Sequence, residues 1–221
     1  MSVSPNYDVR PTSSPIDMLV IHYTGMQSAE AALDRLCDPR AKVSAHYFID
    51  EDGGVASLVD EGKRAWHAGV ASWRGEEDIN ARSIGVELVN PGHEYGYRNF
   101  TEVQMTALIE LVLGVLSRHP IPARNVVGHS DVAPMRKLDP GERFDWAGLA
   151  AAGIGLWPHV VDPVCDFADI SGMLSDYGYD VTNPASAIAA FQRHFHPEIL
   201  NKTVNPETLG RLKSLLVLSN A

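Results

Sequence analysis

The sequence has few cysteines and little positive charge, and each shortage excludes a class of protein. Only two cysteines, Cys37 and Cys165, occur in 221 residues, so we expect reduced thiols and no disulfide framework. Lysine and arginine number 18 against 28 acidic residues, which gives a formal net charge of -10. Nucleic-acid binding needs a basic face that neutralises phosphates, so we expect no nucleic-acid partner.

Long apolar runs are also missing. No stretch is apolar over the length that a membrane span requires, so we expect no transmembrane helix. The first residues lack the basic segment followed by an apolar segment that defines a secretory signal. We therefore expect a cytoplasmic protein, or a periplasmic one if the chain has been trimmed at its start. We also expect a monomer.

Apolar patterns over residues 1–157 alternate between strands and helices. Short strands are predicted at 17–22 (DMLVIH), 83–90 (SIGVELVN) and 125–129 (NVVGH), with a hairpin about an Asp-Gly-Gly turn at 45–60. One helix should start after Ser28, and a longer one should start with a capping box of Thr101 and Gln104. The pattern predicts an α/β domain, with a mixed central β-sheet flanked by helices.

The pattern changes after Trp157-Pro158 to three short helical segments. Apolar positions mark them between Val164 and Leu174, Ile188 and Phe195, and Leu209 and Leu216. We predict a small C-terminal three-helix domain over residues 163–221. A bundle of this size is only marginally stable alone, so it should lean on the first domain.

Two histidines of the C-terminal segment flank an apolar residue. His194 and His196 lie on either side of Phe195, which belongs to the apolar face of the second helical segment. We expect both imidazoles to face solvent and not to bind a metal.

Two predicted strands of the first domain end in a histidine. His22 ends one strand and His129 another, and Asp139 follows in the loop 128–141, which is rich in proline and glycine. Such a loop can hold side chains in a fixed geometry beside a cleft. Two imidazoles and a carboxylate are a common catalytic zinc set that leaves a fourth position for water. Iron accepts the same trio, and a histidine is often just a hydrogen-bonded residue, so the spacing leaves these alternatives open.

Glu87 is a carboxylate inside a strand-like apolar run. Ile84, Val86 and Leu88 alternate on one face of SIGVELVN, so Glu87 shares the other face with Ser83 and Gly85. A carboxylate there is costly unless it faces a polar cleft or has a partner. Partial burial would raise its pKa, which suits a general acid/base near neutral pH. A strand-edge glutamate that points at solvent is the alternative.

Five blocks of the sequence carry a resemblance to a known family. In chain order they are VIHYTG (20–25), SAHYFIDEDG (44–53), RAWHAG (64–69), SIGVELVNPGHEYGY (83–97) and GHSDVAPMRKLDPG (128–141). Together they resemble the zinc-dependent N-acetylmuramoyl-L-alanine amidases, in particular the branch of anhydro-muropeptide and two-domain murein amidases. The resemblance covers about residues 16–157 and implies the fold of peptidoglycan-recognition proteins and T7-lysozyme-like amidases.

The resemblance also implies a reaction and roles for residues. The reaction is zinc-dependent hydrolysis of the amide bond between N-acetylmuramic acid, or its 1,6-anhydro form, and L-alanine, in the recycling or turnover of the cell wall. The family places the zinc on His22, His129 and Asp139. It makes Glu87 the catalytic acid/base and Lys137 the group that stabilises the oxyanion. Its substrate-binding positions correspond to His46, Trp66, His67 and Asn90.

The C-terminal segment resembles peptidoglycan-binding three-helix domains through YGYD (177–180) and AFQRHF (190–195), although HPEILNKTVN replaces their usual Asp-Gly segment. The implied partners are muropeptides or murein. Two alternatives stay open at this point. One is a recognition module that binds muropeptide without cutting it, although such sensors typically lose a metal ligand. The other is a phage lysis amidase, which more often carries a basic wall-binding module.

Overall fold

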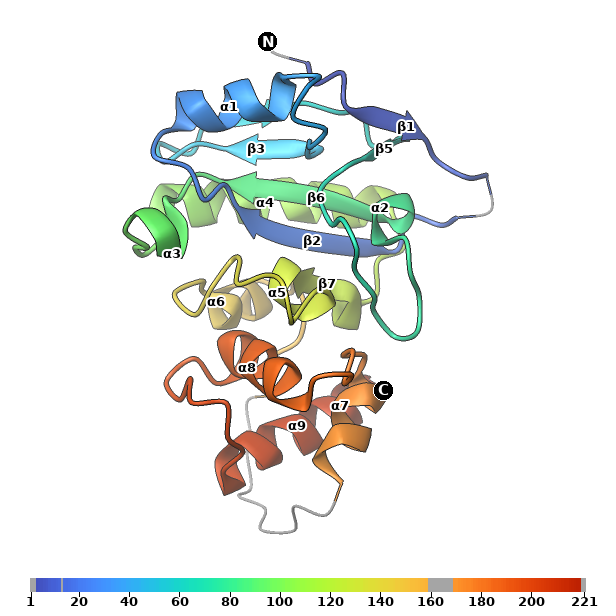
Figure 1. The fold of residues 1–221 in the computed structure, drawn as a ribbon, viewed down its shortest axis with the longest axis vertical. Coiled ribbons are helices and arrows are strands. Elements are labelled where there is room, and N and C mark those ends of the chain that lie inside the picture. Colours follow the sequence, from blue (N-terminus) through green and yellow to red (C-terminus); the bar gives the residue numbers. More distant parts are fainter. Residues whose placement is uncertain (1–2, 13, 159–168, 220–221) are drawn as a thin grey trace.

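The protein is described here by a computed structural model that covers residues 3–12, 14–158 and 169–219. Its centre is a five-stranded sheet in the order β4-β3-β6-β2-β7. The strands are β2 (Met18–Tyr23), β3 (Tyr47–Ile49), β4 (Val55–Ser57), β6 (Ser83–Leu88) and β7 (Val126–Gly128). Neighbouring strands are parallel except at the β3–β4 hairpin, which is antiparallel. The predicted mixed α/β sheet is confirmed, and Figure 1 shows its strands side by side.

The parallel strands bring distant parts of the sequence to one edge of the sheet. β2, β6 and β7 all run in the same direction, so their carboxyl ends lie together. His22 pairs with Glu87 in the register of β2 and β6, and His129 directly follows β7. In open α/β sheets this edge is where ligands bind.

One face of the sheet is covered by the long helix α4 (Glu102–Arg118), which lies behind the strands in Figure 1. Its buried residues pack against alternate residues of β6 in one apolar cluster, which includes Leu108, Val112, Val115, Ile84, Val86 and Leu88. The helix begins with the predicted capping box of Thr101 and Gln104. Because alternate residues of β6 point to opposite sides, Glu87 lies on the face that α4 does not cover.

The helix α1 (Ala29–Cys37) packs against β3 and begins after the predicted N-cap Ser28. Ala32 and Leu36 pack against Phe48 of β3. Cys37 is a free thiol, as expected, whereas Cys165 lies outside the described residues.

Several short elements were not predicted. β1 (Tyr7–Val9) and β5 (Lys63–Ala65) form a separate antiparallel pair. The short helices are α2 (Ile79–Arg82), α3 (Gly92–Tyr95), η1 (Ala123–Asn125), α5 (His129–Val132) and α6 (Trp146–Ala151). Helices of three to six residues are too short for a helical period to be visible in the sequence. One of these short helices, α5, is a single turn at the start of the loop 128–141.

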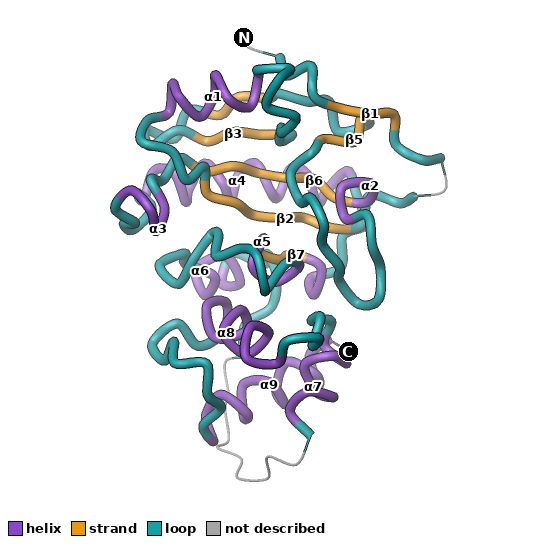
Figure 2. Tube along the Cα trace, viewed as in Figure 1, coloured by secondary structure: helices purple, strands orange, loops and turns teal. Residues whose placement is uncertain are grey.

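The C-terminal segment forms the three predicted helices, α7 (Ile170–Tyr177), α8 (Pro184–Phe195) and α9 (Pro206–Ser219). They lie beyond the β7 edge of the sheet, as Figure 2 shows. Val164 and Phe167, which were expected in the first helix, and the predicted boundary at residue 163 lie outside the described residues. None of the helices within residues 3–12, 14–158 and 169–219 is long and apolar enough to cross a membrane.

The C-terminal helices share an apolar core with the first part of the chain, as their small size predicts. Val20 of β2, Val127 of β7 and Val132 of α5 belong to the same cluster as buried residues of α7, α8 and α9, among them Leu174, Phe191 and Leu212. The C-terminal helices therefore pack against the β2 and β7 side of the sheet and against α5.

The prediction that His194 and His196 face solvent is wrong. Their exposed fractions are 4% and 1%. α8 is the central helix of the C-terminal group, so it is covered on one side by α5 and α6 and on the other by α7 and α9. A helix that is covered on both sides buries its polar positions as well, and these positions then need hydrogen-bond partners.

Candidate active site

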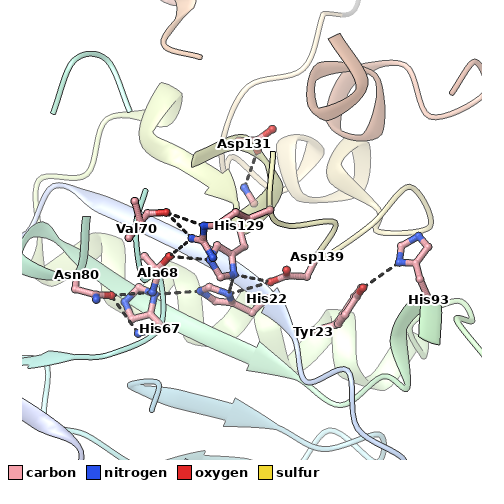
Figure 3. A network of polar contacts seen from close by, with 12 residues as sticks. His22, Tyr23, His67, Ala68, Val70, Asn80, His93, His129, Asp131 and Asp139 are labelled. Carbon is pink, nitrogen blue, oxygen red and sulfur yellow. Dashed lines mark hydrogen bonds and ion pairs between the residues drawn. The ribbon is translucent and has the colours of Figure 1, made fainter. Parts of the chain in front are cut away.

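Three predicted metal ligands converge at the carboxyl edge of the sheet. The Nδ1 atoms of His22 and His129 lie 2.9 Å apart, and each lies 3.0 Å from Oδ2 of Asp139. All three side chains are buried. Figure 3 shows the two rings and the carboxylate pointing toward one another from β2, α5 and the loop that follows α5. Within the described ranges, no other three histidine, cysteine or acidic side chains bring ligand atoms so close together.

The outer nitrogen of each histidine is held by a hydrogen bond. Nε2 of His129 lies 3.0 Å from the Ala68 carbonyl oxygen, which can only accept, so this nitrogen carries the proton and donates. Nε2 of His22 lies 3.1 Å from Nδ1 of His67. The chain of bonds continues from Nε2 of His67 to Ser83 Oγ at 3.2 Å, and from that hydroxyl to the Ile79 carbonyl at 2.6 Å.

These outer bonds fix where the lone pairs point. Because the Ile79 carbonyl can only accept, the Ser83 hydroxyl donates to it, His67 donates to Ser83, and His22 donates to His67. His22 and His129 are thus both held as the tautomer whose bare Nδ1 faces Asp139. An outer hydrogen bond that sets the tautomer is the usual arrangement for a histidine that binds a metal.

The electrostatics of the trio suit a cation. Burial, followed by the nearby His129, lowers the pKa of His22 to about 4, so its imidazole is neutral at pH 7. Burial alone would raise the pKa of Asp139, but the contacts with His129 and His22 lower it below its usual range, so the carboxylate is charged. Two neutral imidazoles and one carboxylate are the protonation states that metal binding requires.

The spacing of the three atoms fits zinc. Zinc binds histidine nitrogen and carboxylate oxygen at about 2.0–2.2 Å in tetrahedral sites, which places neighbouring ligand atoms roughly 3.3 Å apart. The separations of 2.9–3.0 Å in this site are close to that value. Three protein ligands with a fourth position open to a cleft are typical of catalytic zinc sites, whereas structural zinc sites are closed by four.

A cleft of about 660 Å³ opens in front of the trio. His129 and Asp139 line it, together with Glu87 and Lys137, so four of the predicted catalytic and metal-binding residues face one cavity. His22 lies behind them. Trp66 and His67, which were predicted to bind substrate, also line the cleft.

Glu87 has the environment that its sequence pattern predicts. It lies beside His22 on the neighbouring strand, and its Oε2 atom is buried without a hydrogen-bond partner. Burial, and then the charge of Asp139, raises the pKa of Glu87 well above its usual value, although Lys137 partly opposes this. A carboxyl group with an unused oxygen and a raised pKa beside a candidate metal centre can take up and release a proton near neutral pH.

Gly85 allows His67 to take its place. A Cβ atom on Gly85 would lie 2.5 Å from Cγ of His67, so no side chain fits there. Ser83, Gly85 and Glu87 share one face of β6, as predicted, and each serves the site. Ser83 accepts from His67, Gly85 leaves room for its ring, and Glu87 enters the cleft.

Two predicted substrate-binding residues support the walls of the cleft and do not line it. His46 is fully buried, and its ring contacts the Arg10 guanidinium at 2.9 Å and the Gly85 backbone N–H at 2.9 Å. Asn90 is buried as well, and its side chain accepts from the Gly92 N–H and donates to a backbone carbonyl at position 98. The predicted contact of these two residues with substrate stays a prediction. Sequence reasoning placed these residues near the site but could not tell the lining from the layer behind it.

Other residues of the cleft were missed. Arg136 lines it and donates to the Ala68 carbonyl at 3.0 Å, the same oxygen that holds His129. Tyr23 and His93 also line the cleft. The Tyr23 hydroxyl lies 2.9 Å from Nδ1 of His93, and Figure 3 shows this pair beside Asp139. Arg136 lies in the sequence block 128–141 and Tyr23 in the block 20–25. Their nearness in sequence to the ligands was the available signal.

Comparisons with known proteins agree with this geometry. The family model described as N-acetylmuramoyl-L-alanine amidase matches residues 12–142. The chain is 36% identical to N-acetylmuramoyl-L-alanine amidase AmiD of Escherichia coli K12, covering 91% of this chain and 82% of that protein. It is also 36% identical to the 1,6-anhydro-N-acetylmuramyl-L-alanine amidase AmpD of Citrobacter freundii, covering 67% of this chain and 86% of that one.

Solved structures extend the similarity to the C-terminal helices. The E. coli AmiD structure, solved with anhydro-N-acetylmuramic acid-L-Ala-D-gamma-Glu-L-Lys, superposes with a TM-score of 0.83 at 34% identity, covering 95% of this chain and 92% of that one. AmpDh3 of Pseudomonas aeruginosa superposes with a TM-score of 0.84 at 31% identity over 100% of both chains. The fold predicted from the sequence is therefore confirmed.

Proposed function

The chain belongs to the N-acetylmuramoyl-L-alanine amidase family, and from this premise we propose that it hydrolyses the amide bond between N-acetylmuramic acid and L-alanine. The sugar is the ordinary or the 1,6-anhydro form, in peptidoglycan or its fragments, and the reaction belongs to cell-wall recycling or turnover. One observation carries the proposal: His22, His129 and Asp139 converge beside the unpartnered carboxyl oxygen of Glu87 in one cleft.

We propose zinc as the metal that these three side chains hold. The support is the donor set of two imidazoles and a carboxylate, the spacing of the three atoms, and the outer hydrogen bonds to Ala68 and His67. When bound, zinc supplies Lewis acidity, which makes a water molecule a better nucleophile and polarises a carbonyl group. Iron accepts the same trio, but no observation in this cleft favours it.

Glu87 carries the proton in this proposal. It takes a proton from the attacking water while the water oxygen forms a bond to the lactyl carbonyl carbon. It then gives this proton to the amide nitrogen as the carbon–nitrogen bond breaks. The products are the muramic acid sugar with a free lactyl carboxyl group and a stem peptide with a free L-alanine amine. The raised pKa and free oxygen of Glu87 support this role.

Lys137 stabilises the negative charge that develops on the carbonyl oxygen. It lies in the cleft, on the loop between the two ligands His129 and Asp139, and its backbone N–H donates to the Ala133 carbonyl at 3.0 Å. A cation held in place before the reaction stabilises the transition state without needing to reorganise. Trp66 and His67 line the same cleft and are the proposed contacts to substrate.

Soluble muropeptides are the proposed substrates, and we propose that the protein acts on them in the cytoplasm as a monomer. The net charge of -10 supports this, because an anionic enzyme is repelled by the acidic polymers of an envelope. Recovery of the native protein from the periplasm would contradict this location, and size-exclusion chromatography with light scattering checks the monomer.

Product analysis tests the proposed reaction. Purified protein is incubated with 1,6-anhydro-muropeptide, with the ordinary muropeptide and with intact sacculi, and the products are analysed by mass spectrometry. We expect a free stem peptide with an L-alanine amino terminus, and faster release from the soluble substrates. A protein that binds the muropeptide but releases no peptide would instead be a recognition module. Faster cleavage of sacculi would point to a wall-directed enzyme.

A further inference from the structure

Asp131 is a buried carboxylate two residues after the ligand His129. Its exposed fraction is 1%, so its charge needs partners inside the protein. Oδ2 accepts from the Gly128 N–H at 2.7 Å and from Nδ1 of His194 at 2.7 Å, and Oδ1 accepts from the Tyr179 hydroxyl at 2.8 Å. Each carboxylate oxygen therefore has a donor.

Two of these donors come from the C-terminal helices. Tyr179 follows α7 and His194 lies on α8, whereas Gly128 ends β7. Both donor side chains are buried, with exposed fractions of 3% and 4%. The His194 ring also stacks on Trp146 of α6, with ring centroids 3.7 Å apart, so its donor nitrogen is held in one orientation.

Asp131 in turn holds the turn of helix that carries the ligands. It is the third residue of α5 and accepts from the N–H just before the helix, so it fixes the point at which α5 begins. His129 is the first residue of that turn. The next residue, Ser130, donates its backbone N–H to the Asp139 carbonyl at 2.8 Å. One helical turn thus positions both ligands of the loop 128–141.

The packing around α5 limits how this helical turn can move when Asp131 loses a hydrogen-bond partner. A Cβ atom on Gly128 would lie 2.7 Å from Cδ of Pro140, the residue after the ligand Asp139. Val132 is buried in the apolar cluster that α7 and α8 complete. A shift of α5 would therefore move His129 and Asp139 together and not one of them alone.

We propose that Tyr179 and His194 are positioning residues of the metal site, which they reach through Asp131 and α5. The C-terminal helices then contribute to metal affinity and turnover even with small soluble substrates, independently of any binding to the wall. The proposal rests on the proposed zinc site, and it concerns residues that touch neither metal nor substrate. If either donor is removed, the buried charge of Asp131 loses a partner, and the carboxylate shifts toward the remaining donors.

His196, the C-cap residue of α8, provides a matched control close to His194. It is buried to 1% exposure, but its Nδ1 contacts the hydroxyl of Thr208 in α9 at 2.8 Å, away from the ligand loop. His194→Phe and His196→Phe each keep an aromatic ring and remove a hydrogen-bonding nitrogen. Tyr179→Phe is a milder change, because it removes only the hydroxyl that contacts Asp131.

The experiment measures the zinc dissociation constant of each full-length variant by competition with a chromophoric chelator, and kcat and KM on a soluble anhydro-muropeptide. Circular dichroism and thermal melting check the fold. Outer hydrogen bonds to metal sites typically change metal affinity by about 10–100-fold. We expect His194→Phe and Tyr179→Phe to weaken zinc binding about tenfold and to lower kcat at nearly constant KM. His196→Phe should stay within about twofold of the parent protein, even if it melts at a lower temperature.

The results separate this proposal from the proposed function. If the parent protein binds zinc, and both His194→Phe and Tyr179→Phe keep its zinc affinity and kcat, the positioning role is wrong and the amidase proposal stands. Equal losses in His194→Phe and His196→Phe would also overturn the role, because a general loosening of the helices would then explain them. If the parent protein binds no zinc, the proposed function itself is wrong.

Discussion

His22 and His129 at the sheet edge are as deeply buried as His194 and His196 in the C-terminal helices, but their ring nitrogens meet different surroundings. In the helices, each Nδ1 meets a single partner, Asp131 or Thr208. At the sheet edge, two Nδ1 atoms and a carboxylate oxygen lie within 3.0 Å of one another. In both regions, each buried histidine has a hydrogen-bond partner. Only at the sheet edge do the lone pairs of three ligand atoms point toward one position, and this feature marks a candidate metal centre.

The two regions also differ in how the outer ring nitrogens are used. At the sheet edge, the outer Nε2 atoms donate to Ala68 and His67, so the inner nitrogens are left as acceptors. In α8, Nδ1 of His194 is itself the donor, because the Asp131 carboxylate can only accept. One histidine pair is arranged to bind a cation, and His194 is arranged to hold an anion in place.

The largest effect that would test this contrast comes from removing a ligand. His22→Ala takes away one of three converging atoms, whereas His196→Ala takes away a buried ring of similar exposure outside the site. We expect His22→Ala to lose stoichiometric zinc and all measurable amide cleavage. His196→Ala should keep both while it melts at a lower temperature. Metal analysis and a cleavage assay on the two variants measure both quantities. Equal zinc content in the two variants would contradict the difference between the sheet edge and the C-terminal helices.

Glu87→Gln should have the next largest effect. Glutamine keeps the size of the side chain but cannot carry the proton, and loss of a general acid/base typically lowers the rate by about 10²–10⁴-fold. Zinc content should stay the same, because Glu87 is not one of the converging ligands. Glu110→Gln, on the exposed face of α4, is the control and should match the parent protein. Near-full turnover in Glu87→Gln would move the proton transfer to another residue of the cleft.

A smaller effect is expected for Lys137→Met, which keeps the length of the side chain and removes its charge. Loss of one group that stabilises an oxyanion typically costs about 10²–10³-fold in kcat. Zinc affinity and KM should change little, since the ligands stay in place. Lys213→Met, an exposed position on α9, controls for the change in net charge. A rise in KM at constant kcat would instead make Lys137 a substrate-binding residue.

His67→Phe should have the smallest effect of the series on kcat. Phenylalanine fills the space above Gly85 but cannot accept the hydrogen bond from His22. Zinc affinity should fall by about 10–100-fold, and excess zinc should restore turnover because Glu87 and Lys137 are unchanged. Chelator competition and assays at rising zinc concentration measure both quantities. A loss of kcat that excess zinc does not restore would show that His67 does more for turnover than hold the ring of His22.

Much of the sheet and of the converging trio could be predicted from the sequence, because local patterns determine them. The alternation of SIGVELVN predicted the two faces of β6, and the apolar runs predicted strands that end in His22 and His129. The structure shows that these strands are parallel. The carboxyl ends of parallel strands lie at the same edge, so these residues had to approach one another.

The remaining features depend on packing between distant segments, which one sequence does not encode locally. The buried state of His194 follows from α8 being covered on both sides, and its contact spans 63 residues to Asp131. Likewise, His46 and Asn90 belong to the family's sequence blocks, but only the folded chain shows that they lie behind the cleft wall. Proximity to a site can be predicted from a motif, whereas the layer in which a residue lies cannot.

A zinc titration tests the central claim most directly. Metal is removed from the full-length protein with a chelator, zinc is added back in known amounts, and amide cleavage of a soluble anhydro-muropeptide is followed by mass spectrometry. We predict no cleavage without metal, a linear rise with added zinc and a plateau at about one ion per chain, as three ligands in a single site require. Full cleavage by the metal-free protein, or a plateau that His22→Ala reproduces, would contradict the claim.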